Sequence, residues 1–378
     1  MLIKSIELKN YRNYEDLKLE FKSNKILLVG KNAQGKTNLL ESVYYLSCLG
    51  STRAKNDSEL ISWDKTFTKI KGEIIKQDFE ITLEVLMNPP KKREISINGI
   101  RKRRPSEFCE NFCVVSFSAN DLLLLRGTPD DRRNWLDLAI SQIYPAYLDR
   151  LSKYNKIKNQ KNNYLKEIKG NLYCNKDMLE VWNTQLTVAG SNIIFLRLKF
   201  LQELQKIAKV KHSCIAQNET LSLSYNSTVL GDVDFENSTD NQETAIEQIA
   251  AAFEERLNIR QDEEIIRAQA LVGPHRDDIS YFINNIDSKK FASQGQQRTI
   301  VLSLKLAELQ LIKEKINDTP VLLLDDVLAE LDNVRQNYLL SAIGDETQTI
   351  ITSVDTVLFG EDYLKTVDVY KIADGVVG

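Results

Sequence analysis

The stretch that most constrains this chain is GKNAQGKT, residues 30 to 37, which matches the pattern G-x-x-x-x-G-K-[ST]. It follows the apolar run KILLV and precedes TNLLESVYYLSCL, which has the composition of a helix. The glycines allow the backbone to wrap around a phosphate, and successive N–H groups with a helix N-terminus give the loop positive potential. The pattern predicts a strand, loop and helix unit of an α/β domain that binds the phosphates of a nucleotide.

Within this loop, two side chains have distinct expected roles. Lys36 would reach the β- and γ-phosphates, and Thr37 would bind Mg²⁺. The whole nucleotide-contacting set that we expect is Gly30, Lys31, Asn32, Ala33, Gln34, Gly35, Lys36, Thr37 and Asn38.

A P-loop that uses magnesium needs an acidic partner at the end of a neighbouring strand. The run VLLLDD, residues 321 to 326, gives four apolar residues followed by two carboxylates. Asp325 would hold the Mg²⁺, usually through water, and Asp326 would orient the attacking water. The alternative is an ordinary strand end with two solvated aspartates.

The polar run SQGQQR, residues 293 to 298, stands directly before an amphipathic helix expected from Arg298 to about Lys313. A hydroxyl, glycine amides and the helix dipole converge there, so Ser293, Gly295 and Gln296 predict a second anion site. The alternative is a simple helix cap. A cap would need one Ser or Asp, and the further glutamines would be surplus.

Hydrophobic periodicity divides the chain into three stretches, 1–119, 120–261 and 262–378. Alternating strands are expected at IKSIELKN and LKLEF, and a meander between Phe67 and Ile100 with a tight turn at Asn98-Gly99. The middle stretch predicts long polar helices, a short strand at LSLSY and an acidic loop near GDVDFENSTDNQE. The two outer stretches then form one α/β domain, and the middle one an inserted, mostly helical lobe.

The order of these motifs resembles the ABC-type ATPases of the SMC class. In that class a P-loop, a signature motif, a Walker B strand and a D-loop follow one another, and here the last corresponds to Glu330-Leu331-Asp332. The resemblance implies an ABC-type ATPase head with a mixed sheet, in which the signature and Asp332 of one copy contact the ATP held by the P-loop of a second copy. An ATP-dependent homodimer is therefore expected. The chain lacks the sustained heptads of SMC proteins.

Six segments resemble the bacterial RecF recombination proteins: IELKNYRNYEDLKLEF at the start, NAQGKTNLLES, LLLLRGTPDDRRNWLD at 122 to 137, LVGPHRDD at 271 to 278, SQGQQRTIVLSLKLAE, and LLLDDVLAELD. This resemblance implies ATP and DNA binding, action with RecR and RecO to help RecA load, and weak hydrolysis that resets the dimer in repair, replication restart and the SOS response. Arg12 resembles the family's early arginine near the nucleotide, although a surface charge is the alternative. Asp326 replaces the glutamate of vigorous ABC ATPases, which predicts slow turnover.

The sequence departs from the ABC pattern at two places. The segment 116–121 has no glutamine where a glutamine loop is expected, and Ala119-Asn120 stands where Pro-Glu is usual in RecF proteins. The strand TIITS ends in Thr352-Ser353 where transporters have a switch histidine. In GPHRDD, His275 and Arg276 could line the nucleotide or dimer face, or form an ordinary turn.

DNA contacts must come from a local patch, because the formal net charge is −3. One basic cluster flanks the Asn98-Gly99 hairpin, and another lies in the helical lobe; a solvated surface is the alternative for both. The candidate residues are Lys91, Lys92, Arg93, Arg101, Lys102, Arg103 and Arg104 in the first cluster, and Lys153, Lys156, Lys158 and Lys161 in the second.

No stretch approaches transmembrane length and the opening lacks a signal-peptide core, so we expect a cytoplasmic protein without a membrane partner. The five cysteines lack metal spacing and are expected to be reduced and mostly buried. Three alternative classes remain: a transporter ATPase subunit, which would ignore DNA; an OLD-type ATPase, which would need a nuclease domain; and an interaction module with an inactive P-loop.

Overall fold

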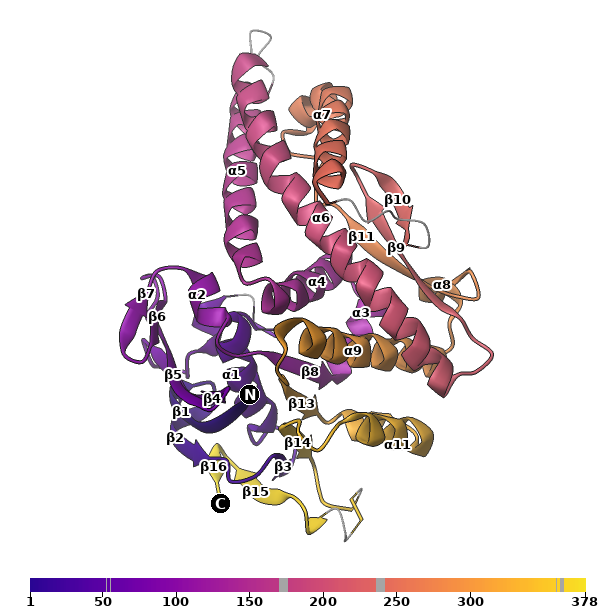
Figure 1. Cartoon of the computed structure of the whole chain (residues 1–378). Coiled ribbons are helices and arrows are strands. Elements are labelled where there is room, and N and C mark those ends of the chain that lie inside the picture. The colour runs from indigo at the N-terminus through magenta and orange to yellow at the C-terminus, as the bar shows by residue number, and fades with distance from the viewer. Residues whose placement is uncertain (52, 55, 170–175, 236–241, 358, 361–363) are drawn as a thin grey trace. The chain divides into compact units, whose positions relative to one another are not determined.

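The computed structural model describes residues 1–51, 53–54, 56–169, 176–235, 242–357, 359–360 and 364–378 (Figure 1). Contacts divide the chain into two compact units. Unit 1 consists of residues 1–121, 141–145 and 302–378, and unit 2 of residues 122–140 and 146–301.

The first sheet of unit 1 carries the P-loop. Five of its strands, β15, β3, β14, β13 and β8, run parallel, and β16 adds an antiparallel edge. Of these, β3, β14, β13 and β8 consist mainly of buried residues, most of them apolar. Such continuous apolar strands are typical of sheets that are covered on both faces. In sheet order the strands are β16 (Val376–Val377), β15 (Asp368–Ala373), β3 (Lys25–Val29), β14 (Thr349–Ser353), β13 (Val321–Asp325) and β8 (Val114–Ser118).

The second sheet of unit 1 is an antiparallel meander that buries alternate residues, as the period-two pattern predicted. The turn at Asn98-Gly99 has positive φ at both residues, 50° and 75°, which fits a tight hairpin. In sheet order the strands are β2 (Tyr14–Glu20), β1 (Leu2–Tyr11), β4 (Thr68–Lys76), β5 (Phe79–Met87), β6 (Glu94–Ile97) and β7 (Ile100–Lys102).

The helices of unit 1 are short except for α1 and the long α9, which begins in unit 2 and continues in unit 1 from Leu302. Helix α9 starts one turn earlier than Arg298, the start that the sequence predicted. The helical segments are α1 (Lys36–Cys48), η1 (Asp57–Leu60), α2 (Pro105–Cys109), η2 (Ala119–Leu122), α9 (Gln294–Ile316), α10 (Val327–Glu330) and α11 (Asn333–Ala342).

Unit 2 combines long helices with a four-stranded antiparallel sheet of order β10-β9-β11-β12. Helices α5 and α6 run antiparallel beside each other, with α7 against α6 (Figure 1). The elements are α3 (Leu123–Arg126), α4 (Pro129–Ile143), α5 (Ala146–Ile168), α6 (Lys176–Ile215), β9 (Leu221–Ser227), β10 (Gly231–Asp234), α7 (Gln242–Arg267), β11 (Asp278–Ile283), β12 (Ile286–Asp287) and α8 (Ser288–Phe291).

The contact-based units differ from the stretches expected from the sequence. Strand β11 pairs with β9 of the helical lobe, so residues up to Val301 belong to unit 2, whereas the sequence pattern placed the boundary after Gln261. Part of the expected acidic loop, residues 236–241, lies outside the described residues, as does Cys174. Of the described cysteines, Cys48, Cys109 and Cys113 are buried and Cys214 is exposed.

Buried polar networks hold the helices of unit 2 together. Arg197, which is 2% exposed, donates to both carboxylate oxygens of Asp137 and to the carbonyl of Pro274. Lys161 of α5 and Glu264 of α7 form a fully buried ion pair of 2.6 Å. Burial lowers the pKa of Lys161, although Glu264 opposes this effect. Among the described residues, no helix is both long and apolar enough to span a membrane.

Candidate nucleotide-binding site

The P-loop connects β3 to α1 at the carboxyl edge of the first sheet. Gly35 has φ of +114°, and a Cβ on Gly30 would lie 2.2 Å from the carbonyl oxygen of Ile372, so both positions require glycine. The Lys36 ammonium donates to the carbonyls of Gly30, at 2.6 Å, and Lys31, at 3.1 Å. The lysine therefore lies folded over the loop, as expected of a phosphate-binding lysine.

The turn between β1 and β2 supports this loop. The Tyr14 hydroxyl donates to the carbonyl of Gly35 at 3.0 Å, and the Asn13 amide donates to the carbonyl of Gln34 at 3.1 Å. Asn38 of α1 donates to Asn13 at 2.8 Å. Sequence reasoning missed Asn13 and Tyr14. The signal available for them was the polar N-Y-R-N-Y turn itself.

Thr37 and Asp325 come together as the sequence suggested. The Thr37 hydroxyl donates to Asp325 Oδ1 at 2.9 Å, and burial raises the pKa of the Asp325 carboxyl. A hydroxyl next to a carboxylate fits a Mg²⁺ ion, which takes oxygen ligands and few protein groups. Strand β13 is not the immediate neighbour of β3, because β14 lies between them. The expectation of an adjacent acidic strand was therefore wrong in strand order.

The intervening strand β14 places Thr352 against both aspartates. Its hydroxyl donates to Asp325 Oδ1 at 2.9 Å and accepts a hydrogen bond from the backbone N–H of Asp326 at 2.8 Å. Asp326 has φ of +54°. From the sequence, Thr352 was noted only as the residue in place of a switch histidine, and its contacts depend on strand order.

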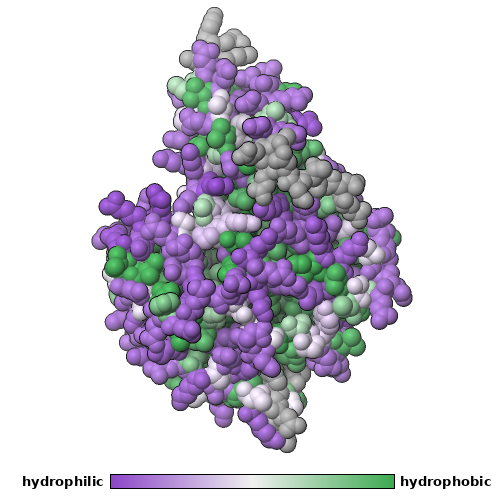
Figure 2. Space-filling model, viewed as in Figure 1, coloured by the Kyte–Doolittle hydropathy of each residue, from purple (hydrophilic) through white to green (hydrophobic). Residues whose placement is uncertain are grey.

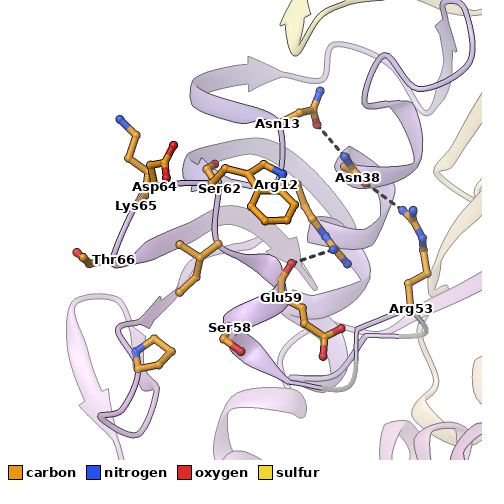
Figure 3. Close-up of a pocket in the computed structure, with 13 residues that line it drawn as sticks. Arg12, Asn13, Asn38, Arg53, Ser58, Glu59, Ser62, Asp64, Lys65 and Thr66 are labelled. Atoms are coloured by element: carbon orange, nitrogen blue, oxygen red, sulfur yellow. Dashed lines mark hydrogen bonds between the residues drawn. The ribbon is translucent and has the colours of Figure 1, made fainter.

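Arg12 lies beside the loop in an open cavity of about 800 Å³ (Figure 3). Its guanidinium makes two hydrogen bonds to the Glu41 carboxylate, of 2.9 and 2.8 Å, and one to the carbonyl of Glu59 at 2.8 Å. Asn38 and Arg53 line the same cavity and are joined by a hydrogen bond of 3.0 Å. Trp63 also lines it and is 93% exposed. The geometry thus places Arg12 near the P-loop and pairs it with Glu41.

The segment after β8 lies beside Thr37 and Asp325. Ser118 and Asn120 line a small cavity together with Thr37 and Asp325. Asn120 thus lines this cavity in the segment 116–121, where the sequence has no glutamine. Asp121, which accepts a hydrogen bond from the Ser118 N–H, has its pKa raised to about 6 by burial.

The polar run at residues 293–298 lies in unit 2, where Ser293 and Gln296 form a capping box for α9. Ser293 N–H donates to Gln296 Oε1 at 2.8 Å, and Gln296 N–H donates to Ser293 Oγ at 3.3 Å. Gln297 accepts from Arg126 at 2.6 Å. The argument that the glutamines would be surplus in a cap was therefore wrong. Ser293 is nevertheless exposed, and Gly295 is partly exposed.

The D-loop aspartate is also a helix cap. The Asp332 carboxylate accepts a hydrogen bond from the backbone N–H of Arg335 at 3.0 Å and forms an ion pair with the Arg335 guanidinium. These contacts lower the pKa of Asp332. The neighbouring Val334 is 68% exposed, so this corner of unit 1 presents an apolar side chain to solvent.

Two of the basic residues predicted to contact DNA do not lie free on the surface. Lys161 is fully buried with Glu264, because it occupies a core position in the spacing Tyr154, Ile157, Lys161, Leu165 of α5. Arg93 donates to the Tyr45 hydroxyl at 2.7 Å and to a backbone carbonyl, and therefore anchors the hairpin.

The other candidates are more accessible. Lys158 is half-buried, Lys102 is partly exposed, and Arg101 pairs with Glu94 at 3.2 Å. The remaining candidates are exposed, and the visible face of the molecule is mainly hydrophilic (Figure 2). These exposed residues are Lys91, Lys92, Arg103, Arg104, Lys153 and Lys156.

The GPHRDD segment turns into unit 2. His275 Nδ1 lies 2.6 Å from the Tyr154 hydroxyl, and its Nε2 lies 3.1 Å from the carbonyl oxygen of Ala270. Burial lowers the pKa of His275 to about 3. Arg276 donates to the same carbonyl. These contacts give both residues a structural role in the turn.

The fold, the P-loop and the carboxylates at the end of β13 define an ATPase head of the ABC and SMC class. A family model described as RecF/RecN/SMC N terminal domain matches residues 2–377. The DNA replication and repair protein RecF of Bacillus pumilus (strain SAFR-032) is 39% identical over 378 residues, which is 100% of each chain. RecF of Bacillus cereus (strain B4264) is also 39% identical and is covered to 98%. The chain therefore belongs to the RecF family, and the resemblance seen in the sequence is confirmed.

Solved structures agree with this assignment. A structure of the recombination mediator protein RecF-ATP in the RecFOR pathway has a TM-score of 0.88 and 33% identity, covering 100% of this chain and 96% of that one. A second, of RecF-ATPrS, has a TM-score of 0.87 and 32% identity, covering 100% and 97%. An Smc head bound to a domain of ScpA has a TM-score of 0.52 and 14% identity, covering 100% and 96%, and supports the fold alone. The expected ABC-type fold class is confirmed.

Proposed function

We propose that this chain is an ATP-gated DNA-binding protein that dimerises on ATP and acts as a recombination mediator. The observation that carries the proposal is the convergence of the P-loop, Lys36 and the Thr37–Asp325 pair at one edge of the sheet. Relatives solved as RecF-ATP and RecF-ATPrS support ATP as the nucleotide.

The residues of the site divide the chemistry among them. The loop amides and Lys36 bind the phosphates, while Thr37 and Asp325 would hold Mg²⁺, which would supply positive charge to the phosphate oxygens. Asp326 orients the attacking water as a general base. Because its side chain is one methylene shorter than that of glutamate, the water is held less well and turnover is slow.

The dimer follows from the exposure of the polar run. Ser293 caps α9 within its own chain, yet its hydroxyl lies at an exposed helix N-terminus, where the helix dipole and backbone N–H groups favour an anion. In the proposed dimer, Ser293, Gly295 and Gln296 of one copy face the γ-phosphate bound by the other, and Asp332 lies at the same interface. ATP therefore completes the interface, and hydrolysis releases it.

Substitutions at Ser293 can separate the cap from the anion site. Asn and Asp are about as good as Ser at a helix N-cap, but only Asp places a negative charge against the γ-phosphate. Light scattering with ATP and Mg²⁺ should show a doubled mass for the native chain and for Ser293→Asn. Ser293→Asp and the bulkier Ser293→Arg should stay monomeric. Equal masses for the Asn and Asp variants would reduce Ser293 to a cap.

Nucleotide binding itself needs a separate control. Lys36→Ala should bind no ATP and should not dimerise, which calorimetry and light scattering would show together. If Lys36→Ala bound ATP like the native chain, the P-loop would not be the nucleotide site and the proposal would fail.

The proposed DNA ligand is duplex or gapped DNA, held through backbone phosphates without base readout. We further propose that the chain acts with RecR and RecO to promote RecA loading, which the RecFOR pathway named for the solved relatives supports. Fluorescence anisotropy with a gapped duplex should show ATP-dependent binding that weakens steeply with salt. Absence of DNA binding would favour a transporter-type ATPase subunit.

A further inference from the structure

Four groups form a continuous chain of hydrogen bonds across the end of the first sheet. The Thr37 hydroxyl and the Thr352 hydroxyl both donate to Asp325 Oδ1, each at 2.9 Å. Thr352 Oγ1 in turn accepts from the Asp326 N–H at 2.8 Å. The chain therefore runs from the first residues of α1 to the backbone of Asp326.

The direction of the Thr352 hydroxyl is fixed by its neighbours. A hydroxyl has one proton, and Asp325 Oδ1 at 2.9 Å is a closer acceptor than the carbonyl of Leu324 at 3.5 Å. One lone pair is then used by the Asp326 N–H. Thr352 is only 2% exposed, so bulk water does not compete for these contacts.

The hydrogen bond to Thr352 holds Asp326 in a sparsely populated backbone conformation. Its φ of +54° lies in the left-handed region, which residues with a Cβ rarely adopt, although Asp does so more often than most. Asp326 is also the N-cap residue that precedes α10, and its side chain makes no capping hydrogen bond. The Thr352 oxygen is therefore the partner that fixes its N–H, and with it the direction in which the carboxylate leaves the chain.

Strand β14 is connected to the P-loop as well. The Gly30 N–H donates to the carbonyl of Ser353 at 3.2 Å, and β14 pairs with β3 on one side and β13 on the other. The end of β14 thus contacts the start of the phosphate loop and both aspartates.

We propose that Thr352 is a positioning residue for ATP hydrolysis: its hydroxyl couples the metal-binding carboxylate of Asp325 to the backbone of Asp326 and so holds the water-orienting carboxylate in place. This inference rests on the proposed ATPase function. It gives Thr352 a defined task, because its one hydroxyl contacts both aspartates.

The test uses three single variants of the full chain. Thr352→Val keeps the β-branched shape and removes the hydroxyl, and Thr352→Ser keeps the hydroxyl. Thr349→Val is the matched control, because Thr349 is equally buried on the same strand and its hydroxyl donates only to the Thr347 carbonyl. Circular dichroism would confirm that each variant is folded.

Two measurements decide the outcome. Hydrogen exchange without nucleotide should show faster exchange at Asp326 in Thr352→Val, and native rates in Thr352→Ser and Thr349→Val. Steady-state ATPase kinetics should show kcat lower by about 10- to 100-fold in Thr352→Val with KM unchanged, and recovery in Thr352→Ser.

Each contrary result has a defined meaning. A native kcat in Thr352→Val, or a change in KM alone, overturns the positioning role. Equal loss in Thr349→Val does so too, because it would indicate a general effect on the strand. If the native chain binds ATP but hydrolyses none, the proposed ATPase falls and the positioning role with it. If exchange at Asp326 is unchanged in Thr352→Val, the hydrogen bond from the Asp326 N–H to Thr352 does not protect this amide. The inference then fails, whatever the ATPase activity of the variant.

Discussion

Lowering the pH should destabilise unit 2 through His275. The Nε2 of its ring faces the carbonyl of Ala270, so this nitrogen carries the proton, and Nδ1 accepts from the Tyr154 hydroxyl. Burial lowers the pKa of His275 from 6.5 to about 3. Between these values the unfolded chain binds a proton that the folded chain does not. The stabilising effect is therefore complete above pH 6.5 and is lost as the pH falls towards 3.

The expected loss at pH 5, relative to pH 8, is about 2 kcal/mol in the free energy of unfolding from this residue alone. Carboxylates with raised pKa act in the opposite direction, since they gain protons on folding; Asp277, whose pKa burial raises, is one in the same unit. The contribution of His275 must therefore be read from the difference between the native chain and His275→Gln, which keeps a donor and an acceptor but does not titrate.

Urea unfolding at several pH values, followed by tryptophan fluorescence, measures this difference. A Trp63→Phe background leaves Trp135 and Trp182, the other two of the chain's three tryptophans, which both lie in unit 2. As the pH falls from 8 to 5, the free energy of unfolding of the native chain should decrease relative to that of His275→Gln, so that the two values converge or cross. His212→Gln, which removes the other histidine, should retain the pH-dependent loss. If the free energies of unfolding of the native chain and His275→Gln changed in parallel with pH, the hypothesis that His275 is buried as a neutral imidazole would be refuted.

Three other experiments test separate parts of the structure. Asp325→Asn should bind ATP normally in EDTA but lose the gain in affinity on adding Mg²⁺; calorimetry would contradict the metal assignment if the gain persisted. Lys161→Met should destabilise unit 2 by about 3–5 kcal/mol in urea unfolding because it leaves Glu264 buried and unpaired, and adding Glu264→Met should restore most of the loss. If Lys161→Met alone were as stable as the native chain, the stabilising role of the Lys161–Glu264 pair would be refuted. Lys153→Glu with Lys156→Glu should weaken binding to gapped DNA and flatten its salt dependence, and unchanged affinity would exclude this helix face as the DNA surface.

Local patterns predicted much of the site. The spacing of glycines, lysine and threonine at residues 30–37 specified a P-loop, and the apolar run ending in Asp325-Asp326 specified a strand with two carboxylates at its end. Both depend on neighbouring residues alone, because turn chemistry and hydrophobic period are properties of a short segment. The Asn98-Gly99 hairpin was predictable for the same reason.

The burial of Lys161 was harder to predict, because a charged side chain is usually exposed to solvent. Lys161 was assigned to a DNA surface, although its helical spacing matches core residues of α5; its partner Glu264 lies far away in the sequence. Only the packing of α5 against α7 determined that this lysine is buried and paired.

The sequence by itself determined the family of the chain, and it predicted which residues bind phosphate and metal. Only the tertiary structure decided that β14 lies between β3 and β13, and so brought the Thr352 hydroxyl between Asp325 and Asp326. The order of strands in a sheet depends on how elements that are distant in the chain pack together. The hydrophobic pattern of a single strand does not depend on which strands lie beside it. The motif was therefore predictable, and the hydrogen-bond chain that aligns its carboxylates was not.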